Sequence, residues 1–193
     1  MNYFFKKVLS QSVLDTRLIS DYPGLAIVSM DMQSRYFYSL SESNQKIILN
    51  SYLDIFKYAA DKNIPVINVL YARDGNIISP LSSSLNNTLH KTFEKNRENA
   101  FRYRSLDAML KNMSVNTLFM MGLKASICAY KSAVNAKELG YSVHTADDVI
   151  ADSSDMIMFV PDKSKGLYQK NGIVYHDSYK NFIQLLETKL LLD

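Results

Sequence analysis

Residues 25–33 read Leu-Ala-Ile-Val-Ser-Met-Asp-Met-Gln, a largely apolar run that ends in a carboxylate and an amide. Residues 25–30 are apolar on both alternating faces, which indicates a strand covered on both sides, as in a parallel sheet flanked by helices. Runs of the same kind occupy residues 65–71 and 115–121, and shorter runs predict strands at 141–146 and 172–175.

Helical periodicity separates these runs. It predicts helices over residues 43–62, 105–113, 127–139 and 177–191. The alternation predicts an α/β fold, a three-layer sandwich with a mostly parallel, Rossmann-like central sheet. Two segments lack a helical pattern: residues 72–92 predict a long loop, either a functional lid or a mobile segment, and residues 156–166 predict an extended stretch and a loop. The predicted helix caps are Ser41 or Ser43, Ser105, and Gly140.

The composition bounds the class of protein. A chain of 193 residues that is 47% hydrophobic suffices for one core, so we expect a single domain over residues 1–193, with residues 1–23 as an N-terminal arm or helix. The net charge of +3 gives no strong attraction to nucleic acid or to a membrane. No apolar run reaches the ~20 residues of a membrane span, and no signal-peptide pattern is present. A single cysteine excludes an internal disulfide and favours a reducing, cytoplasmic location.

Ligands of open parallel sheets bind beyond the carboxyl ends of the strands. The GxGxxG, P-loop and GxSxG motifs are absent from the sequence.

The three histidines are far apart, so we expect surface or loop histidines and no metal site. A basic cluster over residues 91–104 contains Glu94 and Glu98, which indicates a solvated, partly paired face. The polar residues at the predicted strand ends are Asp31, Gln33, Arg73, Asp74 and the turn 124–128; the histidines are His90, His144 and His176; the basic cluster is Lys91, Lys95, Arg97, Arg102 and Arg104.

Cys128 lies about one turn into a predicted helix that follows a buried strand. Free N–H groups and the helix dipole at such a place stabilise a thiolate and can hold an oxyanion. The alternative is a small buried hydrophobe on the inner face of the helix. Two further residues favour a reactive site: Asp31, because a carboxylate that ends an apolar strand is costly to bury without a partner, and Lys95, which Phe93 and Phe101 bracket.

With these segments in view, the chain resembles the isochorismatase-like cysteine hydrolase superfamily, which includes isochorismatases, nicotinamidases and N-carbamoyl amidohydrolases. The resemblance covers roughly residues 24–155. The matching motifs, in chain order, are Asp31-Met-Gln33, Lys95 with Ala100-Phe101, Gly122 with Cys128, and Gly140-Tyr141 with Asp148.

The resemblance implies an isochorismatase-like fold and a catalytic triad. Asp31 is expected to be the base, Lys95 to stabilise the negative groups, and Cys128 to attack a carbonyl. It also implies a cis peptide at Leu123–Lys124, an oxyanion hole made by the backbone N–H groups of Lys124 and Cys128, and a homo-oligomer, a dimer or larger. The residues expected to bind substrate are Gln33, Tyr36 and Lys124.

Metal-binding nicotinamidases carry an Asp and two His after the second strand, whereas residues 71–76 here contain no His. We therefore expect no metal and no cofactor. The predicted function is a metal-independent cysteine hydrolase that cleaves a C–N bond, amide or carbamoyl, of a small molecule through a thioester. Two alternatives stay open: an isochorismatase-type vinyl ether hydrolase, and a catalytically silent relative that binds a ligand or a partner. The final part, residues 156–193, departs most from the family pattern.

Overall fold

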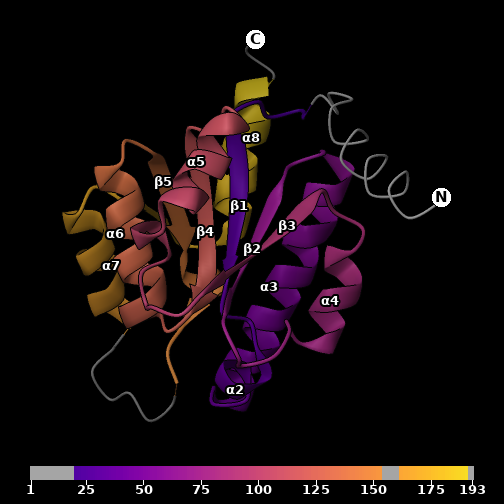
Figure 1. Ribbon diagram of the computed structural model, residues 1–193, viewed down its shortest axis with the longest axis vertical. Helices are drawn as coiled ribbons and strands as arrows, with labels where there is room; N and C mark the ends of the chain where they lie inside the picture. Colours follow the sequence, from indigo (N-terminus) through magenta and orange to yellow (C-terminus); the bar gives the residue numbers. More distant parts are fainter. Residues whose placement is uncertain (1–19, 154–160, 191–193) are drawn as a thin grey trace, which may run out of the picture.

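The computed structural model describes residues 20–153 and 161–190, which form one sheet between two layers of helices (Figure 1). The strand order is β3-β2-β1-β4-β5-β7, β6 pairs with the end of β4, and every pair is parallel. The strands are β1 (Leu25–Met30), β2 (Val66–Tyr71), β3 (His90–Lys95), β4 (Thr117–Leu123), β5 (Ser142–Ala146), β6 (Ile150–Ala151) and β7 (Val174–His176).

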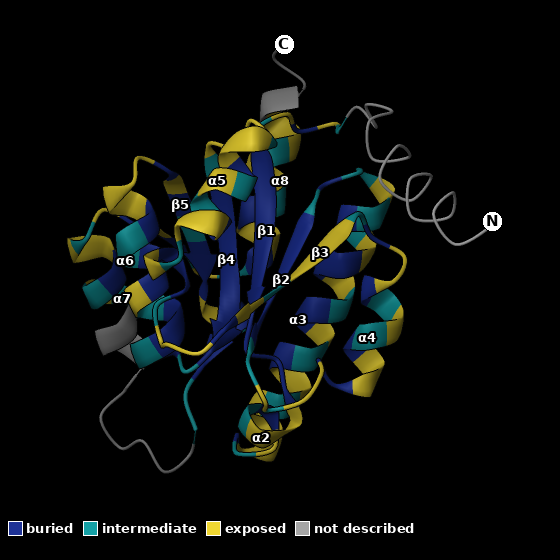
Figure 2. Cartoon of the chain, in the orientation of Figure 1, coloured by how far each residue is buried: buried dark blue, intermediate teal, exposed yellow. Residues whose placement is uncertain are grey.

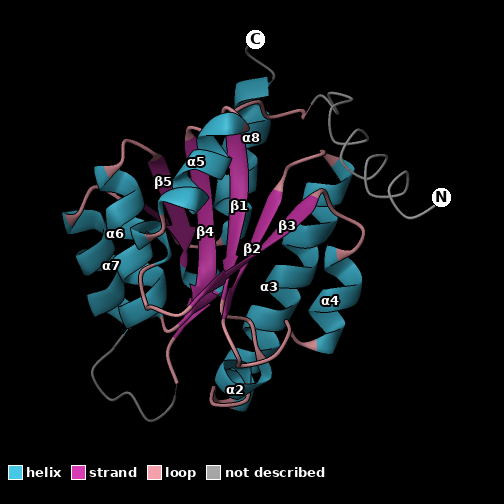
Figure 3. Ribbon diagram, in the orientation of Figure 1, coloured by secondary structure: helices cyan, strands magenta, loops and turns pink. Residues whose placement is uncertain are grey.

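Figure 3 shows α3 and α4 on one side of the sheet and α5, α6 and α7 on the other. A π-helical turn (Ala125–Ala129) leads from β4 into α6, and 3-10 turns occupy residues 100–102 and 147–149. The helices are α2 (Ser34–Phe37), α3 (Glu42–Asp61), α4 (Ser79–Leu85), α5 (Arg104–Asn112), α6 (Tyr130–Glu138), α7 (Pro161–Lys170) and α8 (Tyr179–Leu190). The predicted three-layer α/β sandwich with a mostly parallel sheet is confirmed.

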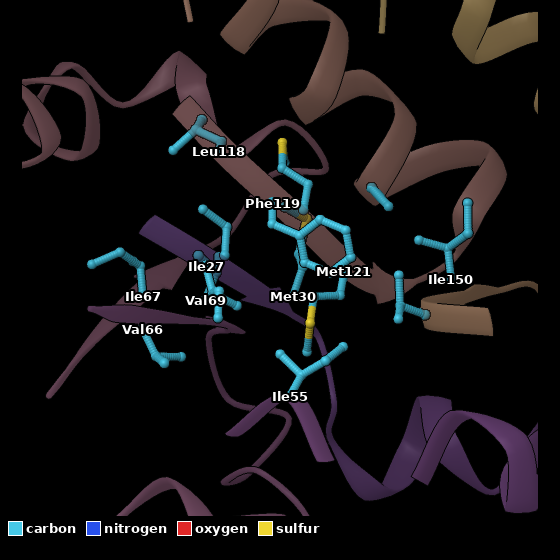
Figure 4. Packing of buried hydrophobic residues seen from close by; sticks show 14 of the residues in the cluster. Ile27, Met30, Ile55, Val66, Ile67, Val69, Leu118, Phe119, Met121 and Ile150 are labelled. Carbon is cyan, nitrogen blue, oxygen red and sulfur yellow. The ribbon is translucent and has the colours of Figure 1, made fainter. Parts of the chain in front are cut away.

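The core lies along the central strands, which are dark blue in Figure 2. All six residues of β1 are buried, as its unbroken apolar run predicted. Figure 4 shows Ile27 of β1, Val69 of β2 and Phe119 of β4 in one cluster with Ile55 of α3. Each such side chain contributes about 1.5–3 kcal/mol when fully buried. The core therefore holds the carboxyl ends of β1, β2 and β4 in fixed relative positions.

Several predicted boundaries are close to those observed. Ser41 is the N-cap of α3, where its hydroxyl accepts a bond of 3.3 Å from the Asn44 N–H, and Gly140 follows α6 with φ of +96°. Ser105 is not a cap, because α5 already begins at Arg104 and Tyr103 takes the N-cap position. β4 begins two residues later than predicted, and the predicted helix over 127–139 overlaps the end of the π-helical turn.

The two segments that lacked a helical pattern contain regular structure. Residues 72–92 include α4 and the start of β3, although we predicted a loop. Of the segment 156–166, residues 156–160 lie outside the described residues, and the helix α7 begins at Pro161, so the predicted loop is wrong there. Proline suits the first turn of a helix, where its missing N–H costs nothing. α4 and α7 are short and mostly polar, so no helical repeat of apolar residues marked them in the sequence.

The predicted N-terminal arm or helix falls almost entirely on residues 1–19, which lie outside the described residues. Within 20–153 and 161–190, no helix is long and apolar enough to cross a membrane.

Candidate active site

Asp31, Lys95 and Cys128 come from three strand ends that meet at one edge of the sheet. Asp31 directly follows β1, Lys95 is the last residue of β3, and Cys128 lies in the π-helical turn after β4. Lys95 Nζ lies 2.8 Å from Asp31 Oδ2, and both side chains are almost completely buried. Since β2 separates β1 from β3, the lysine reaches across β2, where its Nζ lies 4.6 Å from the centre of the Tyr71 ring.

The Asp31 backbone is in the left-handed region, with φ of +57°. This conformation is uncommon for a residue with a side chain, although Asp adopts it more readily than most, and such residues cluster at functional sites. The Asp31 N–H donates to Val69 O at 2.9 Å, so the main chain is still tied to β2 at this point. The strand thus ends in a strained residue whose carboxylate is held beside Lys95.

Burial raises the pKa of the Asp31 carboxyl above its ordinary value, and this effect outweighs the lowering by Lys95. The thiol of Cys128 is near enough to lower this pKa slightly. The other carboxylate oxygen, Oδ1, is buried and makes no full hydrogen bond within the described residues. A buried oxygen of raised basicity is therefore available for a proton beside the thiol.

The electrostatics of Cys128 differ from those predicted. Burial and the negative charge of Asp31 raise the pKa of the Cys128 thiol to about 12, although Lys95 and Lys124 oppose the shift. The expected stabilised thiolate is therefore wrong for the resting protein, since burial and Asp31 outweigh the charges of Lys95 and Lys124. The sulfur rests as a thiol, so it needs a base at the moment of attack.

The turn that carries Cys128 is fixed from both ends. Lys124 has φ of +54°, and its carbonyl accepts bonds from Ile127 N at 2.9 Å and Ala129 N at 3.3 Å. Asp152 accepts a bond of 2.9 Å from the Ser126 hydroxyl and a further bond from the Ser126 N–H. The predicted cis peptide at Leu123–Lys124 is wrong: this bond is trans, and the left-handed Lys124 makes the turn.

Gly122 allows β4 to approach β1 closely at this edge. A Cβ atom on Gly122 would lie 2.6 Å from Met30 Cβ and 2.9 Å from Met30 O. No side chain fits in that space, so this glycine sets how near the Cys128 turn comes to Asp31.

The predicted substrate-binding residues divide into two kinds. Gln33 is buried, and its amide donates to Tyr71 O at 2.9 Å and Gly75 O at 2.6 Å while its oxygen accepts from Tyr71 N at 2.8 Å. Both amide protons are used within the protein, so Gln33 positions the loop after β2 and has no free amide proton to donate to a substrate. Tyr36 and Lys124 do lie together, with Lys124 Nζ 5.2 Å from the Tyr36 ring centre, and Tyr36 donates its hydroxyl proton to Asp74.

Four residues around the Lys95–Asp31 ion pair were not predicted as part of the site. Tyr71 contacts the Lys95 ammonium, and the side-chain oxygens of Ser29, Tyr52 and Asn68 are buried without a hydrogen-bond partner in the described residues. Ser29 and Asn68 are opposite each other on β1 and β2, and Tyr52 lies near Ser29. A polar residue inside an apolar strand run was the signal that could have identified Ser29 and Asn68.

We predicted that all three histidines lie on the surface or in loops, and this prediction is wrong for two of them. His144 of β5 and His176 of β7 are half-buried, and their rings stack. His144 Nδ1 lies 3.0 Å from His176 Nε2. The parallel pairing of β5 with β7 explains why two residues distant in sequence meet. Over residues 20–153 and 161–190, no group of three or more His, Cys, Asp or Glu side chains is arranged to hold a metal ion.

A model of the isochorismatase domain matches residues 25–157, which is more than half of the chain and includes all three residues of the site. The chain belongs to the isochorismatase family. This is the family that the motifs had indicated.

Comparisons with individual proteins agree with membership of the isochorismatase family. The chain is 25% identical over 132 residues to isochorismatase family protein 2A of Dictyostelium discoideum, and it spans 64% of that relative's length and 64% of its own. MAR1 ribonuclease of Caenorhabditis elegans superposes with a TM-score of 0.72 at 16% identity, over 89% of this chain and 91% of that one. N-carbamoylsarcosine amidase of Thermoplasma acidophilum superposes with a TM-score of 0.64 at 18% identity, over 79% of this chain and 95% of that one. At such identities the two structures show a shared fold only.

Proposed function

We propose that the protein is a cysteine hydrolase that cleaves the C–N bond of a small amide or carbamoyl compound without a metal ion. The observation that carries this proposal is the buried Lys95–Asp31 ion pair beside the only cysteine of the chain. A buried ion pair is costly and contributes little net stability, so a chemical role explains it better than a structural one. The fold shared with an N-carbamoylsarcosine amidase is consistent with such a substrate.

In the first half of the reaction, the Cys128 sulfur attacks the carbonyl carbon and its proton passes to Asp31. The tetrahedral adduct then expels the nitrogen group, which takes that proton from Asp31, and a thioester is left on Cys128. Because the pKa of the thiol is raised to about 12, proton removal must accompany the attack. The raised basicity of the Asp31 carboxylate favours that transfer.

In the second half, water attacks the thioester carbon and gives its proton to Asp31. The C–S bond breaks, the acid product leaves, and the sulfur recovers the proton. The Lys95 ammonium, 2.8 Å from Asp31, offsets the negative charge on Asp31 and on the sulfur. Lys124 and Cys128 would contribute backbone N–H groups to the oxyanion, and Lys124 and Tyr36 would form the wall against which substrate binds.

A panel of small amides and carbamoyl compounds, incubated with wild type, Cys128→Ala and Lys95→Met, tests this proposal. Wild type should release amine or ammonia from at least one compound, and rapid quenching followed by mass spectrometry should find the acyl group on Cys128. Lys91→Met is the matched control, because Lys91 lies on the same strand with its side chain exposed. Equal turnover by wild type and Cys128→Ala would refute the role of Cys128 as the nucleophile.

A second candidate is an isochorismatase-type vinyl ether hydrolase. It is favoured by the raised pKa values of Asp31 and of the Cys128 thiol, because a vinyl ether needs a proton donor and no nucleophilic sulfur. Release of pyruvate from isochorismate that persists in Cys128→Ala and is lost in Asp31→Asn would support this candidate over the amidase.

A further inference from the structure

A cavity of about 710 Å³ lies between the loop that follows β3 and the outer face of α6. We call it the Arg97–Arg102 cavity, after two of the residues that line it. Tyr71 forms part of its wall, and the same ring lies 4.6 Å from Lys95 Nζ. Tyr130, two residues beyond Cys128, lines it as well. The Tyr71 ring is therefore shared by the cavity wall and the surroundings of Lys95, although Asp31, Lys95 and Cys128 do not themselves line the cavity.

The walls of this cavity are held in place before any ligand arrives. The Ala100 N–H donates to the Ser132 hydroxyl at 3.0 Å, and Asn99 Nδ2 donates to Asn135 Oδ1 at 3.0 Å. The Asn99 side chain also accepts from the Phe101 N–H at 2.9 Å. These contacts join the loop to α6, so little ordering would be needed on binding.

Only some of the charged side chains that line the cavity form an ion pair or a hydrogen bond. Lys131 forms an ion pair with Glu98, and Glu138 accepts a bond from Asn135. Arg97 and Arg102 line the cavity, and within the described residues neither guanidinium has an ion pair or a hydrogen bond. The lining holds the cations Arg97, Arg102 and Lys131 and the carboxylates Glu98 and Glu138, so its charge is positive by one. Two arginines without an ion pair and two tyrosine rings in one lining are the chemistry that recognises an anion attached to a small organic group.

We propose that the Arg97–Arg102 cavity binds a carboxylate or phosphate carried by the substrate, remote from the bond that is cleaved. This inference rests on the proposed function, because it makes the cavity an extension of the site at Cys128. It narrows the substrate class to acidic amides or carbamoyl compounds. An uncharged amide of the same size would lack this contact and would be a poorer substrate.

Two alkylating reagents of equal length test the inference without knowledge of the substrate. N-bromoacetylglycine carries a carboxylate, and N-bromoacetylglycinamide replaces it by a neutral amide. At pH 8.5 and low salt, the acid should alkylate Cys128 about fivefold or more faster than the amide in wild type. Arg97→Gln and Arg102→Gln should each reduce that ratio severalfold. The matched control Arg104→Gln, an exposed arginine outside the cavity lining, should leave it unchanged.

Calorimetric titration with inorganic phosphate and, separately, with N-acetylglycine distinguishes the two sources of negative charge. Tighter binding of one of them, weakened about fivefold or more in Arg97→Gln and Arg102→Gln but not in Arg104→Gln, identifies the preferred group. Binding and alkylation ratios that are the same in all four proteins would overturn the anion site. Anion binding by a protein whose Cys128 forms no acyl intermediate would instead retain the site and refute the proposed hydrolase.

Discussion

Lys95 Nζ and Asp31 Oδ2 lie 2.8 Å apart, although their strands are separated by β2 and their positions by 64 residues of sequence. Neither charged group is exposed to solvent. Lys95 therefore lowers the pKa of Asp31 against the effect of burial, and both charges act on the pKa of the Cys128 thiol. Four substitutions test this coupling and the geometry that supports it.

Lys95→Met should move the acid limb of the kcat/KM profile to higher pH by about one unit or more. Asp31 accepts a proton only when ionised, so activity is lost as the pH falls through its pKa. Burial already raises that pKa and Lys95 lowers it, so removing the ammonium raises it further. Loss of one partner of a buried pair should also reduce the free energy of unfolding by ~3–5 kcal/mol in urea titrations near neutral pH. Lys91→Met should change neither quantity, and an unmoved acid limb in Lys95→Met would contradict the coupling.

Asp31→Asn should lower the pKa of the Cys128 thiol while it abolishes turnover. Burial and, after it, the Asp31 charge raise the thiol pKa to about 12, and Lys95 opposes them, so the neutral amide removes one of the two raising effects and keeps the cation. The pH dependence of thiolate absorbance near 240 nm, with Cys128→Ser as the blank, measures this pKa. A rise in the thiol pKa, or retained turnover, would refute the role of Asp31 as base.

Gly122→Ala should destabilise the protein by ~1–3 kcal/mol or more, because the new methyl group would lie 2.6 Å from Met30 Cβ. The displaced strand end should also reduce kcat. Gly166→Ala in α7 is the control: nothing lies within 4 Å of its added methyl group, so a helical alanine there should raise stability by about 0.5–1 kcal/mol. Thermal unfolding of both variants decides between a local clash and a general intolerance of alanine.

Asp152→Ala should lower kcat about tenfold or more with a smaller change in KM, since the carboxylate fixes the turn that carries Cys128. Ser126→Ala should have a weaker effect, because it loses the hydroxyl contact and keeps the backbone N–H contact. If the two variants had equal effects, the backbone contact would not be the one that positions the turn.

The sequence predicted the centre of the sheet well and its edge poorly. β1, β2 and β4 are buried on both faces and appear as apolar runs, whereas β3 is an edge strand whose residues are mostly exposed, so no pattern identified it. Lys95 was therefore identified from its place between Phe93 and Phe101 and from the family motif, without a predicted strand to carry it. The raised pKa of Cys128 could not be predicted, because it depends on burial by distant segments and on Asp31. The polar contacts of Gln33 depend on the loop after β2 in the same way. The homo-oligomer and the cytoplasmic location stay predictions.

The 193 residues contain a single cysteine, and it is the one beside Asp31. Oxidation of this sulfur to a sulfenic acid would remove the nucleophile, and the chain offers no second thiol to resolve it as an intramolecular disulfide. Reactivation after peroxide exposure would therefore require a reductant such as glutathione or dithiothreitol from outside the chain.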